Sequence, residues 1–151
     1  MSKLRDFVYA VLAGISISIG GVVYLSLENK MVGALLFSVG LFTVCTFGLN
    51  LFTGKVCYLP GKGASYVGWL ALVWLGNLVG AELTGLLVRA TRIGAALSER
   101  AMGLCETKLG DSLPSIFILA IFCNIMIYIG VENYRSNPHE VGKYLGIVFG
   151  V

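Results

Sequence analysis

The stretch NLFTGKVCYLPGKG, residues 50–63, interrupts the chain directly after an apolar run long enough to lie in lipid. It offers a hydroxyl at Thr53, a flexible residue at Gly54 and a proline at Pro60. An unpaired backbone amide or carbonyl is costly in lipid, so a chain that leaves the helix at membrane depth must be shielded by protein or must line a wet cavity. Two interpretations stay open: an ordinary helix end with a glycine cap, or a break inside the membrane.

The composition of the chain indicates that it lies in a lipid bilayer. Of the 151 residues, 57% are hydrophobic and 13% are charged. The mean hydropathy is +0.86. These values lie well outside the range of soluble domains, so we expect an all-α membrane protein.

Four segments reach or approach the length of a transmembrane helix. A span needs about 20 apolar residues, because a rise of ~1.5 Å per residue must cover a hydrocarbon core of roughly 30 Å. The predicted spans are residues 7–27, 31–52, 64–88 and 114–131, and a fifth apolar segment begins at Tyr144. Residues 1–151 are therefore interpreted as one transmembrane domain with an incomplete fifth span.

The first segment resembles a secretory signal only in part. Its apolar stretch is longer than the core of a signal peptide and no A-x-A cleavage pattern follows, so we expect a retained span. Positive charges favour a cytoplasmic N-terminus only slightly, with six predicted inside and five outside. Those inside are Lys3, Arg5, Lys55, Lys62, Arg135 and Lys143, and those outside are Lys30, Arg89, Arg92, Arg100 and Lys108.

Several function classes are disfavoured by what the chain carries. The net charge of +3 is scattered, which argues against nucleic-acid binding. The four cysteines have no metal-ligand or redox spacing, and His139 is the single histidine, so no metal site, cofactor or hydrolytic triad is predicted. We expect no enzyme activity.

Small residues recur at helical spacing and predict a tight bundle. Gly76 and Gly80 are four apart, as are Gly14 and Ser18. The hydrophobic effect does not drive helices together in lipid, so association depends on close backbone approach at such residues.

The residues around the interruption could also form a gate. Leu51 and Phe52 would narrow and dewet a path, while Thr53 and freed backbone groups would meet a polar solute. Gly54 can adopt unusual dihedrals, which a break would need.

The chain resembles the formate/nitrite transporter family in three features taken together. These are the stretch FSVGLFTVCTFGLNLFTGK, the stretch GNLVGAELTG, and a lysine 16 residues ahead of Asn124 in CNIMIYIGV. The resemblance covers essentially the whole chain. It implies a homopentamer in which each protomer holds its own pore in an aquaporin-like bundle of inverted three-helix repeats. Of these repeats, only the first four spans and the start of the fifth are present here, and the second helix is expected to be broken at Leu51–Gly54.

The resemblance also assigns site residues. The family's apolar constrictions fall on Phe37 and Leu41 on one side and on Leu51 and Phe52 on the other. Thr53 matches its pore threonine. Lys108 matches the lysine thought to attract the anion, and Asn124 the asparagine that follows it in the fourth helix.

Physical chemistry supports a role for Lys108 but leaves an alternative. The residue follows an amphipathic segment, residues 93–107, and precedes a span, so it could equally be an interfacial lysine paired with Glu106 or Asp111. A buried cation would attract a small anion and raise its chance of gaining a proton, because the neutral acid crosses an apolar constriction more cheaply than the ion.

Two features depart from the family. Asn50 stands where an acidic residue is usual, and the mid-pore histidine and the sixth helix are not in this sequence, so the chain is expected to be truncated or completed by a partner. Glu82 is interpreted as structural or as a partner of Arg89.

We therefore expect a multi-pass protein of the cytoplasmic membrane that forms a pH-dependent channel for small anions of the formate, nitrite and hydrosulfide type. The alternative is a membrane scaffold or inactive fragment that transports nothing.

Overall fold

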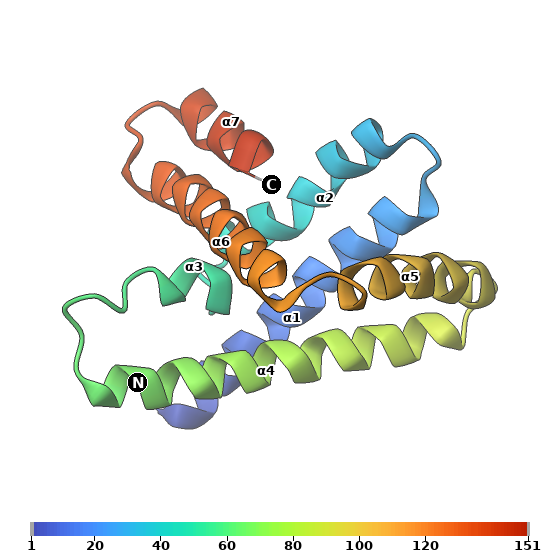
Figure 1. Ribbon diagram of the computed structural model, residues 1–151. Helices are drawn as coiled ribbons and strands as arrows, with labels where there is room; N and C mark the ends of the chain where they lie inside the picture. Colours follow the sequence, from blue (N-terminus) through green and yellow to red (C-terminus); the bar gives the residue numbers. More distant parts are fainter. Residues whose placement is uncertain (1, 151) are drawn as a thin grey trace.

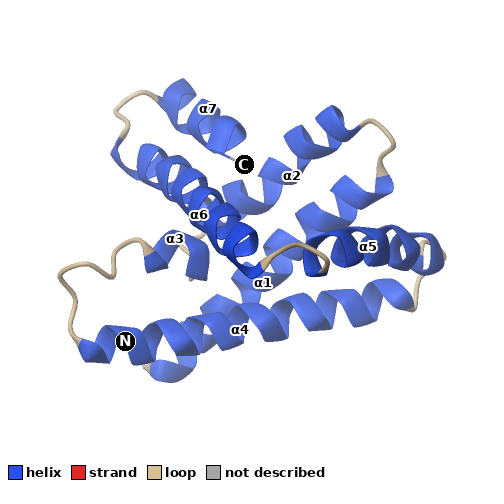
Figure 2. Cartoon of the chain, in the orientation of Figure 1, coloured by secondary structure: helices blue, strands red, loops and turns tan. Residues whose placement is uncertain are grey.

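The computed structural model describes residues 2–150, which form helices and loops and contain no strand. Figure 2 shows this all-helical architecture. The helices are α1 (Lys3–Ser26), α2 (Lys30–Thr46), α3 (Phe52–Val56), α4 (Ala64–Arg89), α5 (Gly94–Leu109), α6 (Leu113–Ser136) and α7 (Glu140–Gly150). By length and composition, α1, α4 and α6 can each cross a membrane, and α2 is a shorter apolar helix.

Successive membrane helices run in alternating directions through the bundle. Short loops join α1 to α2 and α6 to α7, which makes each pair antiparallel. α1 packs mainly on α4 and α2, and α5 lies against α1 and α4 (Figure 1). α5 connects the end of α4 to the start of α6 on the same side of the bundle. α6 therefore runs antiparallel to α1, so the second repeat begins in the inverted orientation.

Glycines set the closest helix contact, between α1 and α4. A methyl group at Gly80 would overlap the carbonyl oxygen of Val11, and one at Gly14 would overlap the carbonyl oxygen of Asn77. At Gly76 it would lie 2.5 Å from the Ala10 side chain. The predicted face formed by Gly76 and Gly80 is therefore the surface on which α1 rests.

The two antiparallel pairs use glycine in the same way. Gly20 and Gly40 lie at the α1–α2 contact, where an added methyl would come within 2.8 Å of a carbonyl oxygen of Phe37 or Ser16, respectively. In the α6–α7 pair, Gly130 faces Gly146 and Gly150. Close backbone approach is thus repeated in both halves of the chain.

The second helix is broken, as predicted, but the break lies earlier in the chain than Leu51–Gly54. α2 ends at Thr46 and the chain is irregular over residues 47–51, which we call the break. Gly48 has a φ of 62°. The Gly48 N–H donates to Cys45 O at 3.3 Å and the Leu49 N–H to Val44 O at 2.9 Å, the paired bonds of a Schellman cap. The glycine cap and the membrane break are therefore the same feature.

Other boundaries also shift. α1 begins at Lys3, α6 continues to Ser136 and α7 begins at Glu140, all beyond the apolar segments that defined the predicted spans. Polar residues extend these helices because a helix satisfies its own backbone on either side of the lipid boundary.

Of the two interpretations of Glu82, the pair with Arg89 is not found within the described residues. Between residues 2 and 150 the ion pairs are Arg135–Glu132 and Lys143–Glu140, and Glu82 lies on an exposed face of α4.

We expect Gly80→Ala to destabilise the protein, because the methyl group must push α1 away from α4. Gly85→Ala is the matched control on the same helix, since nothing lies within 4 Å of the added methyl. Thermal unfolding in detergent should show a lower midpoint for Gly80→Ala. Gly85→Ala should be unchanged or higher, because alanine favours a helix over glycine by about 1 kcal/mol. Equal midpoints for the two variants would contradict the packing described here.

Candidate functional site

The break is held in place by the side chain of Asn77, which projects from the middle of α4. Its Oδ1 accepts a hydrogen bond from the Phe52 N–H at 2.8 Å, and its Nδ2 donates to Asn50 O at 2.9 Å and to Ala10 O at 2.8 Å. Asn77 thus caps the first N–H of α3 and joins α1, α4 and the break. This satisfies backbone groups that would otherwise be unpaired at membrane depth.

Asn50 supplies the second set of contacts at the break. Its side chain is buried, the Nδ2 donates to Asp6 O at 3.2 Å, and its backbone N–H donates to Tyr9 O at 3.3 Å. The residue that departs from the family pattern is therefore part of the hydrogen-bonded support of the break. Asp6 is itself buried and accepts a hydrogen bond from Trp69 Nε1 at 3.1 Å, which links the start of α1 to α4.

Two of the predicted constriction residues meet in the apolar core. Leu41 is fully buried and Leu51 is 8% exposed, and they belong to one cluster with Ala13 of α1 and Ile147 of α7. The buried members of this cluster come from α1, α2, α7 and the break. Because Leu51 is the last residue before α3, the break presents its side chain directly to this core.

The structure brings together a second pair of predicted residues. Phe52 and Asn124 line a groove of about 310 Å³ between α3 and α6, together with Phe117 and Ile121. Asn124 Nδ2 donates to Ala120 O at 2.6 Å in its own helix. Its Oδ1 is buried and has no hydrogen-bond donor within the described residues. The groove thus combines apolar walls with one unsatisfied acceptor, which could accept a hydrogen bond from a solute or from water.

The remaining predicted residues lie apart from these pairs. The Phe37 ring is half-buried against Gly20 and Gly21 of α1. Thr53 is half-buried in the first turn of α3, and Gly54 faces Val131 of α6.

Lys108 lies at the end of α5 and is exposed. Within residues 2–150 it forms no ion pair, so the predicted pairing with Glu106 or Asp111 is not found. The segment that precedes Lys108 is the helix α5. α5 ends on the side of the bundle where α6 begins.

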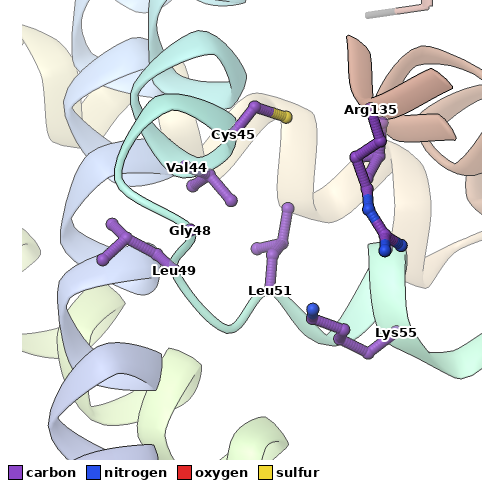
Figure 3. Close-up of a pocket in the computed structure, with 9 residues that line it drawn as sticks. Val44, Cys45, Gly48, Leu49, Leu51, Lys55 and Arg135 are labelled. Atoms are coloured by element: carbon purple, nitrogen blue, oxygen red, sulfur yellow. The ribbon is translucent and has the colours of Figure 1, made fainter. Parts of the chain in front are cut away.

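A cavity beside the break contains charges that the sequence did not single out. It has a volume of about 220 Å³ and is lined by Val44, Cys45, Gly48, Leu49, Leu51, Gly54, Lys55, Val131 and Arg135. Figure 3 shows Lys55 from α3 and Arg135 from α6 extending toward the same space beside Leu51. We call this the cation cavity. A lysine one turn after Leu51 was visible in LFTGK, but its position inside a pocket required the fold.

The loop after α3 is fastened to α6 next to this cavity. Tyr58 donates a hydrogen bond to Glu132 Oε2, and Arg135 Nη1 donates to Tyr58 Oη at 2.9 Å. Glu132 also accepts from Ser136 Oγ at 2.9 Å. Burial, followed by the hydrogen bond to Glu132, raises the pKa of the Tyr58 phenol, so this residue keeps its proton and its role as donor at neutral pH.

The comparisons with known proteins agree on one family. A family model described as formate/nitrite transporter matches residues 1–151. The formate channel FocB of Escherichia coli K12 is 29% identical over 147 residues, which cover 83% of this chain and 51% of FocB. The formate channel FocA of the same strain is 30% identical over 168 residues, covering 98% of this chain and 59% of FocA.

A solved structure gives the same result at the level of the fold. A pentameric formate channel with formate bound matches with a TM-score of 0.84 and 27% identity, over 98% of this chain and 66% of that chain. The chain thus spans about half to two-thirds of the length of the proteins it matches.

We expect Asn77→Ala to destabilise the protein by about 2 kcal/mol or more, because it leaves the Phe52 N–H and the Asn50 carbonyl without their partner at the break. Leu78→Ala is the control, since Leu78 is the next residue on α4 and is 43% exposed. Thermal unfolding in detergent would measure the difference. Equal loss in the two variants would show that the Asn77 hydrogen bonds contribute nothing specific.

Proposed function

Because the chain belongs to the formate/nitrite transporter family, we propose that it forms the greater part of a channel for small monovalent anions of weak acids, with formate as the first candidate. The named relatives are formate channels, and the matching solved structure contains bound formate. Nitrite and hydrosulfide remain alternative substrates within the same chemical class. The protein would then act as a homopentamer in the cytoplasmic membrane, with its N-terminus in the cytoplasm.

The observation that supports this proposal most directly is the break itself. The apolar helix α2 ends at Thr46 and the chain becomes helical again at Phe52, which places non-helical backbone next to buried leucines. Non-helical backbone at membrane depth is found where it is buried in protein or lines a cavity, and here the cation cavity lies beside it. A protein that served only as a scaffold would have no use for this arrangement.

The path proposed for the solute passes from a cationic end through apolar narrow points. Lys108 would draw the anion toward the end of α5, and Leu41 and Leu51 would form a dry barrier that favours the neutral acid. Phe37 and Phe52 would narrow the path on either side. Thr53 and Asn124 would supply hydrogen bonds between these apolar groups, with the unpaired Asn124 Oδ1 able to accept one from the acid proton.

The pH dependence proposed here follows from this barrier. A weak acid crosses an apolar constriction at lower cost when protonated, so uptake should rise as the outside pH falls. The competing function, a helical scaffold without transport, predicts no flux at any pH.

We expect the full-length gene product in liposomes to carry formate, and Lys108→Ala to lower its uptake by about tenfold, equivalent to ~1.4 kcal/mol of lost attraction. Lys108→Arg should retain most uptake because it keeps the positive charge. Arg92→Ala is the control, since Arg92 is an exposed cation in the loop before α5.

Formate uptake at several outside pH values would measure both effects. Absence of flux in the unmodified protein would favour the scaffold. Normal flux in Lys108→Ala would show that this lysine is only an interfacial residue.

A further inference from the structure

The charges around the cation cavity are not balanced. Lys55 forms no ion pair within residues 2–150, and Arg135 faces the same cavity. The nearest carboxylate is Glu132, whose Oε2 lies 3.7 Å from Arg135 Nη1 and which also accepts the hydrogen bonds of Tyr58 and Ser136. One carboxylate therefore stands against two cations, and the cavity keeps a positive excess.

The position of the cavity relates it to the proposed path. Leu51 and Val44 belong to both the cavity wall and the buried apolar cluster, so the cavity lies against the dry barrier. Lys55 is held half-buried by α3, whose carbonyl at Lys55 accepts a hydrogen bond from Tyr66 Oη at 2.9 Å. The Lys55 ammonium thus lies at the cavity wall, and the backbone that carries it is held in place by this hydrogen bond.

The cavity and Lys108 lie at opposite ends of the bundle. Lys108 lies shortly before the start of α6, while Arg135 is in its last turn. α6 has 24 residues, which at ~1.5 Å per residue separates its ends by about 35 Å. Lys108 is therefore too far from Lys55 and Arg135 to bind the same anion with them.

We propose that Lys55 and Arg135 form an anion-binding vestibule for small carboxylates on the N-terminal side of the apolar barrier, separate from Lys108. The identity of the anion rests on the proposed function, whereas the positive cavity itself does not. A water molecule takes roughly 30 Å³ in the liquid, so about 220 Å³ holds a formate-sized anion with some of its hydration. An anion between the two cations relieves their repulsion and is released toward the barrier or back to water.

Cys45 lines the same cavity and provides a direct probe of its electrostatic potential. The test uses the full-length gene product in phosphatidylcholine vesicles, with Cys57, Cys105 and Cys123 replaced by serine and Cys45 kept. Anionic and cationic methanethiosulfonates of similar size react with the Cys45 thiolate, and the ratio of their rates follows the local potential. Neutral phosphatidylcholine removes anionic lipid headgroups as an alternative source of the anion.

Lys55→Gln should lower the ratio of the anionic to the cationic labelling rate by about sevenfold to fiftyfold, because both reagents attack the same thiolate and the ratio cancels any change in its ionisation. This is the range for reagents of opposite unit charge at ~7 Å from the removed charge and an effective dielectric constant of roughly 40–80. Arg135→Gln should act in the same direction, and Lys55→Arg should leave both rates near those of the parent. Lys62→Gln is the matched control, because Lys62 is an exposed lysine in the loop after α3 and does not line the cavity.

Formate uptake by the same vesicles separates the two proposals. The expected result is the shift in labelling together with a higher formate concentration for half-maximal uptake in Lys55→Gln. A labelling shift without any formate flux overturns the proposed function and supports the vestibule. Normal flux together with a ratio of labelling rates that does not change in Lys55→Gln or Arg135→Gln overturns the vestibule.

Discussion

The hydrogen bonds of the Asn77 amide are the constraint on which the rest of this structure depends. A helix that stops within a bilayer leaves backbone groups that lipid cannot satisfy, and the structure solves this locally. The Schellman cap at Gly48 closes the end of α2, and Asn77 caps the start of α3 from another helix. The same amide also bonds to α1, so the break is positioned by the two helices that pack most closely.

This arrangement explains why glycines gather on the α1–α4 contact. Asn77 reaches Ala10 O only because α4 lies directly on α1, which requires the absence of side chains at Gly14, Gly76 and Gly80. Packing and polar satisfaction are therefore coupled. A larger residue at these positions would separate the helices and would also remove the support of the break.

The polar and apolar parts of the site are separated along the bundle. In the proposed path the buried leucines would form a dry barrier, and the cations lie outside the leucine cluster, with Lys108 before the start of α6 and the cation cavity beside its end. A low-dielectric barrier between two positive regions would attract small anions to either end and oppose their passage as ions. This is a physical basis for selecting weak acids over stronger ones.

The sequence by itself determined the solvent, the helical class and the family, because hydropathy over about 20 residues and the spacing of LFTG, NLVGA and Lys108 are local properties of the chain. The family resemblance also predicted a broken second helix, with the break at Leu51–Gly54 because the family's break lies at its LFTG motif. The cap at Gly48, which ends α2 before that motif, was not recognised.

Only the tertiary structure decided that Asn77 and Asn50 support the break, that Leu41 and Leu51 meet with Ile147, and that Lys55 and Arg135 share a cavity. These residues are up to 106 positions apart (147 − 41). No local pattern specifies such contacts, because they depend on how closely the helices approach one another, and that distance is set by packing between distant segments.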